Sequence, residues 1–413
     1  MTVPMNANLT GCRSCDSKHL TTFLRLGTLP LSGHLLRAED LDKQEPRYPL
    51  DVALCAECSL VQILYTVPPE EVFATEYPYY SSVSPTWVAH CKRNVDALVK
   101  RFTLGVNHFA VEIASNDGYL LQHFLPHGVK VLGIDPAAGP VEKARAIGVP
   151  TLLGFFTEQV SNVVMAAHGL ADVVLGNNVL AHVADTNGFV AGVAALLKDT
   201  GVAVFEFPHV MQLIERCEFD TIYHEHLCYY SLTSLFPLFA RHGLTIFDVE
   251  QLPTHGGSLR IYADRNCRPT TKAVQNLWAE EQVRGLNHLG YYRDFAARVK
   301  DVQTKLHTFL SAERIAGRRV VAYGAAAKGG TMLNSTGITT SLLDYVVDKS
   351  PFKQGRYMTG SRLPVHSPQK LLDDQPDYAL LLTWNFKEEI LEQQAEYRTR
   401  GGKFVLPVGL EVI

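Results

Sequence analysis

HFAVEIASNDGYLLQHF, residues 108–124, is the stretch that decides the fold. Its apolar run ends at Ile113 and predicts a buried strand, Ala114–Gly118 predicts a tight turn, and YLLQHF predicts the start of a helix. A strand followed by a turn of small residues and a helix N-terminus lets the backbone approach a ligand closely. The stretch therefore predicts the first unit of an α/β domain with a ligand site at this turn.

A second strand is predicted in VKVLGIDP, residues 129–136, and it ends at Asp135, 17 positions after Gly118. An acid at this place can accept hydrogen bonds from ribose hydroxyls. The turn lacks the G-x-G-x-x-G glycines of a dinucleotide fold. Glu112 followed by a turn ending in Gly118 is closer to the first motif of S-adenosylmethionine-dependent methyltransferases. An NAD-binding Rossmann domain and an α/β core without a ligand stay open as alternatives. Further strands are expected at 149–156, 171–183 and 201–208.

Length and composition indicate a globular chain of several domains. At 413 residues it is too long for one ordinary core, so two or three domains are expected. The net charge of −4 argues against a broad nucleic-acid surface. No apolar run is long enough to span a bilayer, and the N-terminus lacks the apolar core of a secretion signal. We therefore expect a cytoplasmic protein that binds neither nucleic acid nor membrane.

Four of the eight cysteines form two C-x2-C pairs, Cys12 with Cys15 and Cys55 with Cys58, separated by 39 residues. Each pair presents two sulfurs to one ion, and four thiolates close a tetrahedral shell around zinc. A closed shell leaves no position for substrate, so the metal is expected to be structural. Disulfides are the alternative, but a reducing compartment disfavours them.

FDTIYHEHLCYYS, residues 219–231, places Glu225 between two histidines, His224 and His226. A metal-binding pair on a helix is spaced by three or four residues, whereas a spacing of two puts both side chains on one face of a strand. The spacing disfavours a catalytic metal. A polar strand and an acid–base site stay open.

A second α/β pattern begins at GRRVVAYGAAAKGGTMLN, residues 317–334, with Lys328 in the first turn of a predicted helix. Lysine near a helix N-terminus suits a phosphate group, although a purely structural domain is the alternative. Upstream, QLPTHGGSLRIYADR (251–265) offers His255 or Arg260 as a phosphate or substrate contact, or is only a turn before a strand.

Taken in order behind the double C-x2-C, the motifs VEIASNDG, GIDPA, GFF, NNVLAHV, FEFPH and FDTIYHEHLCYYS resemble one family along essentially the whole chain. It is the nucleotide-sugar C-methyltransferases, which place a branching methyl on 4-keto-deoxysugars in antibiotic pathways. The resemblance implies an α/β protein with a zinc-binding module (1–75), a central Rossmann-like methyltransferase domain (76–300) and a C-terminal Rossmann-like domain (301–413). The family's first motif is often E-I-G-C-N-D-G, whereas Ala114-Ser115 stand here in place of Gly-Cys.

The resemblance also implies the chemistry: S-adenosylmethionine as methyl donor, a dTDP-linked sugar as substrate, and a proton removed next to a ketone. Histidine is the usual base for such a step. By resemblance, His226 is this base, Glu225 its partner, and Tyr223 lies in the pocket; His182 and Tyr77 match further substrate-contacting positions. Asp135 is expected to bind the ribose. The other cofactor candidates are Glu112, Ala114, Asn116, Gly118, Phe156 and Asn178, and the other substrate candidates are Arg260, Lys328, Asn334 and Asn385.

Two other functions stay in competition: a nicotinamide-dependent nucleotide-sugar oxidoreductase and a nucleotide-sugar-binding protein without catalysis. The missing phosphate-binding glycines count against the first. The Y-x-E-H and NNVLAH motifs count against the second. We expect the enzyme to act as a monomer.

Overall fold

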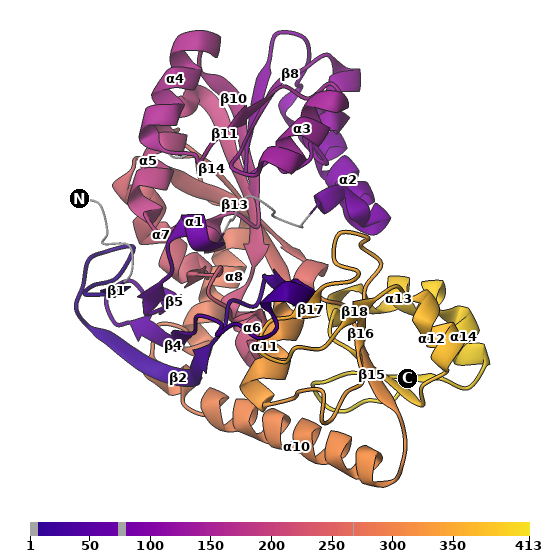
Figure 1. Ribbon diagram of the computed structural model, residues 1–413. Coiled ribbons are helices and arrows are strands. Elements are labelled where there is room, and N and C mark those ends of the chain that lie inside the picture. The colour runs from indigo at the N-terminus through magenta and orange to yellow at the C-terminus, as the bar shows by residue number, and fades with distance from the viewer. Residues whose placement is uncertain (1–6, 73–79, 267) are drawn as a thin grey trace.

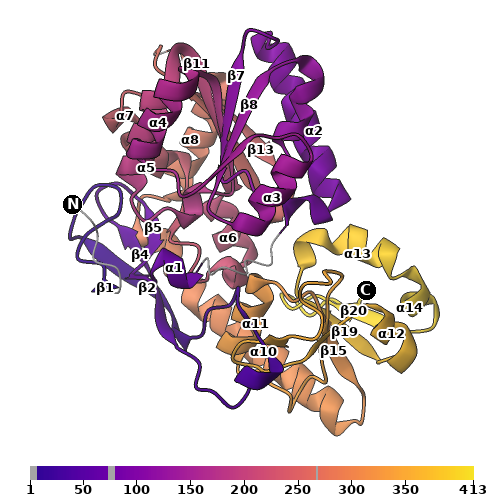
Figure 2. The same cartoon turned by 45° about the horizontal axis from the view of Figure 1, so that its top comes forward.

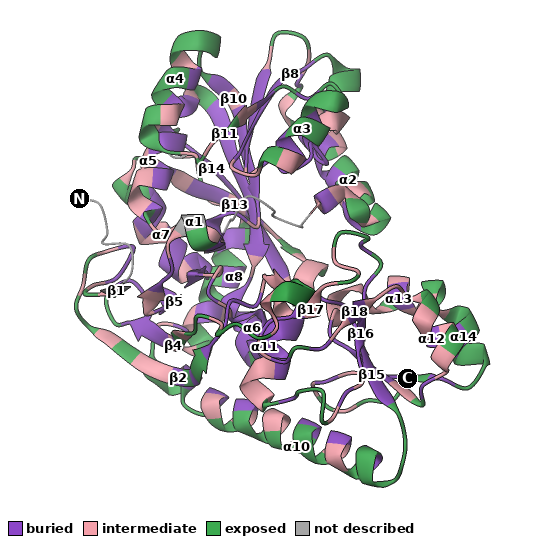
Figure 3. Cartoon of the chain, viewed as in Figure 1, coloured by how far each residue is buried: buried purple, intermediate pink, exposed green. Residues whose placement is uncertain are grey.

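The computed structural model describes residues 7–72, 80–266 and 268–413, and it contains a small N-terminal module, a central α/β unit and a C-terminal α/β unit (Figure 1). The predicted α/β class with two Rossmann-like units is confirmed. Buried residues fill the strands, and the outward faces of the surrounding helices are exposed (Figure 3). No helix in the described ranges is long and apolar enough to cross a membrane.

The N-terminal module is built on an antiparallel sheet whose strand order is β12-β5-β4-β2. Three of its strands come from the module itself: β2 (Leu20–Leu29), β4 (Tyr48–Cys55) and β5 (Val61–Ile63). The fourth, β12 (Cys228–Tyr229), belongs to the H-E-H segment, so this segment is part of the module's sheet. Two short pairs complete the module: β1 (Ala7–Asn8) with β6 (Tyr65–Thr66), and β3 (Leu35–Leu36) with β17 (Tyr357–Met358) of the C-terminal unit.

The central unit is a seven-stranded sheet of order β13-β14-β11-β10-β7-β8-β9, in which β14 alone runs against its neighbours. Its central strands are uniformly buried because helices cover both faces. Helix α2 (Pro85–Phe102) packs on one face, and α4 (Glu158–His168), α5 (Thr186–Leu196) and α7 (Leu232–Arg241) pack on the other (Figures 1 and 2). The strands are β7 (Phe109–Ile113), β8 (Lys130–Asp135), β9 (Thr151–Leu153), β10 (Ala171–Asn177), β11 (Leu197–Pro208), β13 (Thr245–Leu252) and β14 (Ser258–Asp264).

The C-terminal unit is a parallel sheet of order β18-β16-β15-β19-β20. Helices α8 (Lys272–Arg284), α9 (Leu289–Tyr292) and α10 (Phe295–Ile315) lead into it from the central unit. Its strands are β15 (Val320–Tyr323), β16 (Val346–Val347), β18 (Val365–His366), β19 (Tyr378–Leu381) and β20 (Lys403–Val405), and its helices are α11 (Ala327–Thr336), α12 (Gln369–Asp374), α13 (Lys387–Gln393) and α14 (Ala395–Thr399).

Both α/β sheets have a point where the chain changes direction across the sheet. In the central sheet it lies between β7 and β10, and in the C-terminal sheet between β15 and β19. Open α/β sheets bind their ligands outside the carboxyl ends of the strands at such a switch point. Helix α11, which follows β15, packs against the 3-10 turn η6 (Phe219–Thr221), which comes after α6 (Val210–Arg216) in the chain.

One local prediction was wrong, and one alternative that the sequence left open, a strand at the H-E-H triplet, is not what the structure shows. The helix predicted to begin in YLLQHF is replaced by two 3-10 turns, η3 (Leu121–His123) and η4 (Leu125–His127). Pro126 lacks the N–H that an α-helix needs and disfavours helical backbone at the residue before it. The H-E-H triplet is a turn, and strand β12 begins only two residues after it.

Candidate active site and cysteine cluster

The turn after β7 lies at the switch point of the central sheet and has a left-handed backbone at three positions. The φ angles are 58° at Ala114, 48° at Asn116 and 77° at Gly118. Glycine adopts such angles freely, whereas alanine does so at a cost of roughly 1–2 kcal/mol. Ala114 in this conformation therefore strains the backbone of the turn.

Asp135 closes the same turn. Its Oδ2 accepts the backbone N–H of Asn116 at 2.8 Å, and its Oδ1 accepts that of Ala137 at 2.9 Å. Each carboxylate oxygen retains a further acceptor position, which fits a ribose hydroxyl. Burial raises the pKa of Asp135, and the two backbone bonds act in the opposite direction.

Other cofactor candidates differ in what surrounds them. Glu112 is fully buried at the end of β7, and burial raises its pKa well above the usual value. Across the switch point, the buried Oδ1 of Asn178 has no hydrogen-bond partner among the described residues. This oxygen can therefore accept a hydrogen bond from a donor group of a bound ligand. Phe156 packs edge-on against Phe189 of α5, with ring centres 5.4 Å apart.

His226 is held in one orientation by two hydrogen bonds. Its Nδ1 lies 2.9 Å from the carbonyl oxygen of Thr221, and its Nε2 lies 2.8 Å from the hydroxyl of Tyr223. Because a carbonyl only accepts, Nδ1 carries the proton and Nε2 is the basic nitrogen. Burial lowers the pKa of His226 well below its usual value, and His182 acts in the same direction. The ring is therefore neutral and able to accept a proton at neutral pH.

His182 and Glu225 surround this base. The rings of His182 and His226 meet edge to face with centres 4.8 Å apart. Burial lowers the pKa of His182 to about 4, opposed by a hydrogen bond to the backbone of Glu225. Burial raises the pKa of the Glu225 carboxyl to about 7. The Thr221 carbonyl and the Tyr223 hydroxyl occupy both ring nitrogens of His226, so its orientation does not come from that carboxyl.

Lys328 projects from the first turn of α11 toward the end of β19. Its ammonium donates to Oδ1 of Asn385 at 2.9 Å and lies 4.5 Å from the ring centre of Trp384. Trp384 donates its indole N–H to Asp220 at 2.7 Å. Burial lowers the pKa of Lys328, and the charges of Asp220 and Glu218 oppose this shift. The 3-10 turn that carries Asp220 and Thr221 packs on α11, so Lys328 and His226 belong to one neighbourhood.

His255 connects the two α/β units. Its Nε2 lies 3.3 Å from Nδ2 of Asn178, and its Nδ1 lies 3.4 Å from Nδ2 of Asn385. Its φ of 51° is uncommon for a residue other than glycine and is often found at functional sites. Contacts therefore run from Lys328 through Asn385 and His255 to Asn178, and they join the switch points of the two sheets.

Two further sequence candidates, Arg260 and Asn334, are held by other partners. Arg260 donates to Glu206 at 2.7 Å and to Glu250 at 2.9 Å within a buried network. Asn334, at the far end of α11, donates to the carbonyl of Thr359 at 3.1 Å. Tyr77 lies outside the described residues.

Sequence reasoning missed the Thr221 carbonyl, which is a backbone group without a side-chain signal. It also missed Trp384 and the acids Asp220 and Glu218. The acids could have been suspected from their position just before the H-E-H triplet.

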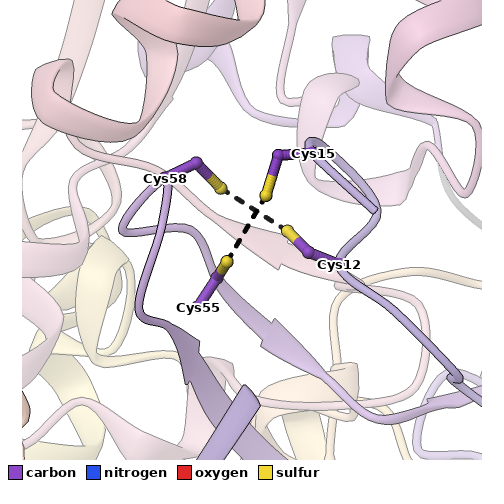
Figure 4. A group of neighbouring side chains, drawn as sticks. All are labelled: Cys12, Cys15, Cys55 and Cys58. Carbon is purple, nitrogen blue, oxygen red and sulfur yellow. Dashed lines mark hydrogen bonds between the residues drawn. The ribbon is translucent and has the colours of Figure 1, made fainter. Parts of the chain in front are cut away.

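The four predicted metal ligands form one cluster. Their sulfur atoms all lie within 4.8 Å of one another, with Cys12 to Cys58 and Cys15 to Cys55 at 3.5 Å each (Figure 4). Zinc bound tetrahedrally at about 2.3 Å places its sulfurs roughly 3.8 Å apart. Gln62 donates its side-chain amide to the sulfur of Cys12 at 3.1 Å, as donors around metal-bound thiolates do. The donor set fits a structural zinc ion.

Three family models match the chain in succession. They are described as "Putative zinc binding domain" at residues 12–73, "Methyltransferase domain" at 89–249 and "C-methyltransferase C-terminal domain" at 253–409. "C-methyltransferase NovU" of Streptomyces niveus is 35% identical over 402 residues, which is 96% of this chain and 95% of that protein. "Ubiquinone biosynthesis O-methyltransferase" of Rhodopseudomonas palustris (strain BisA53) is 30% identical over 94 residues, 23% of this chain and 37% of that protein.

A solved magnesium protoporphyrin IX methyltransferase (ChlM) of Synechocystis PCC 6803 with bound SAH covers 44% of this chain and 85% of its own, at 17% identity and a TM-score of 0.34. The α/β unit and the matching methyltransferase model define the class of protein: an S-adenosylmethionine-dependent methyltransferase. The match to NovU over nearly the full length of both proteins is more specific. The chain belongs to the C-methyltransferase family.

Replacing Asp135 by alanine should weaken cofactor binding, because both the ribose acceptors and the two backbone hydrogen bonds that close the turn are lost. We expect a loss on the order of 1.5–3 kcal/mol, or roughly 10- to 150-fold in Kd. Calorimetry with S-adenosylhomocysteine measures it. Asp199→Ala is the matched control, since that side chain is 90% exposed. Unchanged affinity in Asp135→Ala would show that the cofactor does not use the end of β8.

Proposed function

We propose that the enzyme transfers a methyl group from S-adenosylmethionine to the carbon next to the ketone of a nucleotide-linked 4-keto-deoxysugar, with a dTDP-linked sugar as the first candidate. The observation that carries the proposal is the His226 ring, whose tautomer is fixed by Thr221 and whose basic nitrogen faces Tyr223. Carbon methylation next to a ketone requires a base at this place. Removing the acidic hydrogen creates the carbon nucleophile.

In the proposed reaction, Nε2 of His226 takes the proton from the carbon next to the ketone. The electron pair of the broken C–H bond forms the enolate. S-adenosylmethionine supplies the methyl group as a sulfonium electrophile. The Tyr223 O–H occupies the one lone pair of Nε2 in this structure, so in the proposed reaction it first turns to the ketone oxygen of the substrate, where it stabilises the developing enolate and leaves Nε2 free to accept the proton. The neutral state of His226 before the reaction supports this sequence, because a protonated ring could not begin it.

The C-terminal unit is proposed to hold the nucleotide diphosphate. Lys328 and Asn385 follow β15 and β19, the two strands that flank the switch point of the C-terminal sheet. A half-buried ammonium at this position attracts a diphosphate, and His255 links it to the central site. The chain is proposed to divide into the units 1–75, 76–300 and 301–413, and the four-cysteine cluster to hold one structural zinc ion.

Removing the charge of Lys328 should weaken binding of the sugar nucleotide. We expect Lys328→Met to raise the KM for the sugar nucleotide at least about 10-fold, while the affinity for S-adenosylhomocysteine stays within a factor of about two. Lys370→Met is the control, because Lys370 lies on α12 and pairs with Asp374 at the surface. An unchanged KM in Lys328→Met would show that the diphosphate does not bind at helix α11.

The function itself is tested by mass spectrometry. Incubation with S-adenosylmethionine and a set of dTDP-linked 4-keto sugars should give a product about 14 mass units heavier, by net replacement of one hydrogen by methyl. Thermal shifts with S-adenosylhomocysteine, NAD(P) and dTDP distinguish the alternatives, because a ligand at 100 times its Kd adds about 2.7 kcal/mol. Stabilisation by NAD(P) alone would favour an oxidoreductase.

A further inference from the structure

A loop of the N-terminal module, residues 30–36, lies directly against the H-E-H triplet. We call it the wedge loop. A Cβ atom added at Gly33 in this loop would lie 1.9 Å from Oε1 and 3.0 Å from Cδ of Glu225. Gly33 is not among the residues with positive φ, so its backbone does not require glycine. Glycine is required at this position because the Glu225 carboxyl takes the space that a Cβ would need.

The wedge loop also contacts α11, the helix that carries Lys328. The hydroxyls of Ser32 and Thr331 lie 3.1 Å apart, and a Cβ at Gly330 would lie 2.9 Å from the backbone oxygen of Ser32. Thr359 donates to the carbonyl of Leu31 at 2.8 Å, and β3 pairs with β17 next to it. The loop thus lies between Glu225 of the central unit and α11 of the C-terminal unit.

The rest of the N-terminal module contacts the chain just before and just after Glu225. Before Glu225, the ring of His224 lies 3.1 Å from the carbonyl oxygen of Tyr48 in β4. After it, the N–H of Ile63 donates to the carbonyl of Leu227 at 3.0 Å, and β12 pairs with β5. Three successive contacts with one module therefore fix the path of the chain through the H-E-H triplet.

We propose that the wedge loop is a positioning element of the active site, and that Gly33 is the residue through which it sets the carboxyl of Glu225. The proposal rests on the proposed function, because Glu225 directly precedes His226, the proposed base, in the chain. Glycine at this position lets the carboxyl lie against the loop backbone, while Ser32 fixes the loop to the helix of Lys328. The N-terminal module then does more than add stability, because it aligns groups from the other two units.

Gly33→Ala tests this directly. The atom that the new Cβ meets is the end of a flexible side chain, so the fold should survive while the carboxyl is displaced. We expect an unchanged melting temperature, unchanged affinity for S-adenosylhomocysteine, and a fall in kcat of at least about 10-fold with the KM for the sugar nucleotide within a factor of about three. Gly105→Ala is the control, because nothing lies within 4 Å of a Cβ there and its φ is not positive.

A rescue experiment separates positioning from general damage. Aspartate in place of Glu225 is one methylene shorter and makes room for the methyl group that Gly33→Ala introduces. The double variant Gly33→Ala/Glu225→Asp should therefore be no slower than Glu225→Asp alone. Two residues that act independently would give a double variant whose fall in kcat is the product of the two single falls, whereas coupled neighbours are non-additive. Such a product in the double variant, or full activity in Gly33→Ala, would overturn the proposal.

A measurement without substrate keeps this test independent of the proposed function. Amide hydrogen exchange of residues 223–229 should be faster in Gly33→Ala than in the wild type and unchanged in Gly105→Ala. If the wild type methylates no 4-keto sugar, the proposed function fails and this exchange still decides whether the loop positions the triplet. Equal exchange in the wild type and Gly33→Ala would overturn the positioning role.

Discussion

Replacing His226 by alanine is expected to slow methyl transfer by roughly 10²- to 10⁴-fold, the usual effect of losing a general base. The loss follows from the geometry, because His226→Ala removes Nε2, the basic nitrogen that the Thr221 contact leaves without a proton. Both ligands should still bind, because Asp135 and Lys328 lie on other elements. Steady-state rates and calorimetry with each ligand measure the two effects separately.

Isotope exchange gives a sharper test of the same base. In D2O with S-adenosylhomocysteine bound, the wild type should incorporate deuterium at the carbon next to the ketone, and His226→Ala should not. His224→Ala is the comparison variant: it loses the contact with Tyr48 that helps to position the triplet but keeps the base, so its exchange should be slowed far less than that of His226→Ala. Exchange lost only in His224→Ala would move the base to that residue. Exchange kept in both variants would leave the H-E-H triplet without a role in proton removal.

The overall architecture was predictable because local sequence patterns specify it. The apolar run that ends at Ile113, the small turn after it and the acid at Asp135 all fall where a parallel α/β unit needs them. The two C-x2-C pairs likewise predicted a cluster, because a knuckle brings its two sulfurs together locally. The helix expected from YLLQHF failed because Pro126 prevents its continuation, a local signal that was present in the sequence.

Much of the candidate site was not predictable, because its contacts join segments far apart in the chain. Gly33 and Glu225 meet although they belong to distant parts of the sequence, and no periodicity in either segment indicates the contact. The orientation of His226 depends on the backbone carbonyl of Thr221, which any residue at that position could supply. The family resemblance predicted which side chains belong to the site. The backbone and packing contacts that position them are visible only in the folded chain.

The second large effect is expected at the cysteine cluster. Replacing Cys55 by serine should abolish most of the soluble yield, because structural zinc contributes about 10–16 kcal/mol in small zinc domains. That is comparable with the whole stability of a typical protein, about 5–15 kcal/mol. The cluster lies at one end of the sheet that β12 joins, so loss of the metal should also release the segment that follows the H-E-H triplet.

Metal content and activity must therefore be measured together. The purified wild type should contain one zinc per chain by elemental analysis, and the soluble remainder of Cys55→Ser should lose activity in proportion to its lost zinc. Cys217→Ser is the control: this buried free cysteine lies outside the cluster, so zinc content should be unchanged. A wild type without zinc, or normal folding after all four cysteines are replaced by serine, would contradict the metal site. Full activity in zinc-free, folded protein would separate the zinc ion from catalysis, because the sheet that holds β12 would then form without the ion.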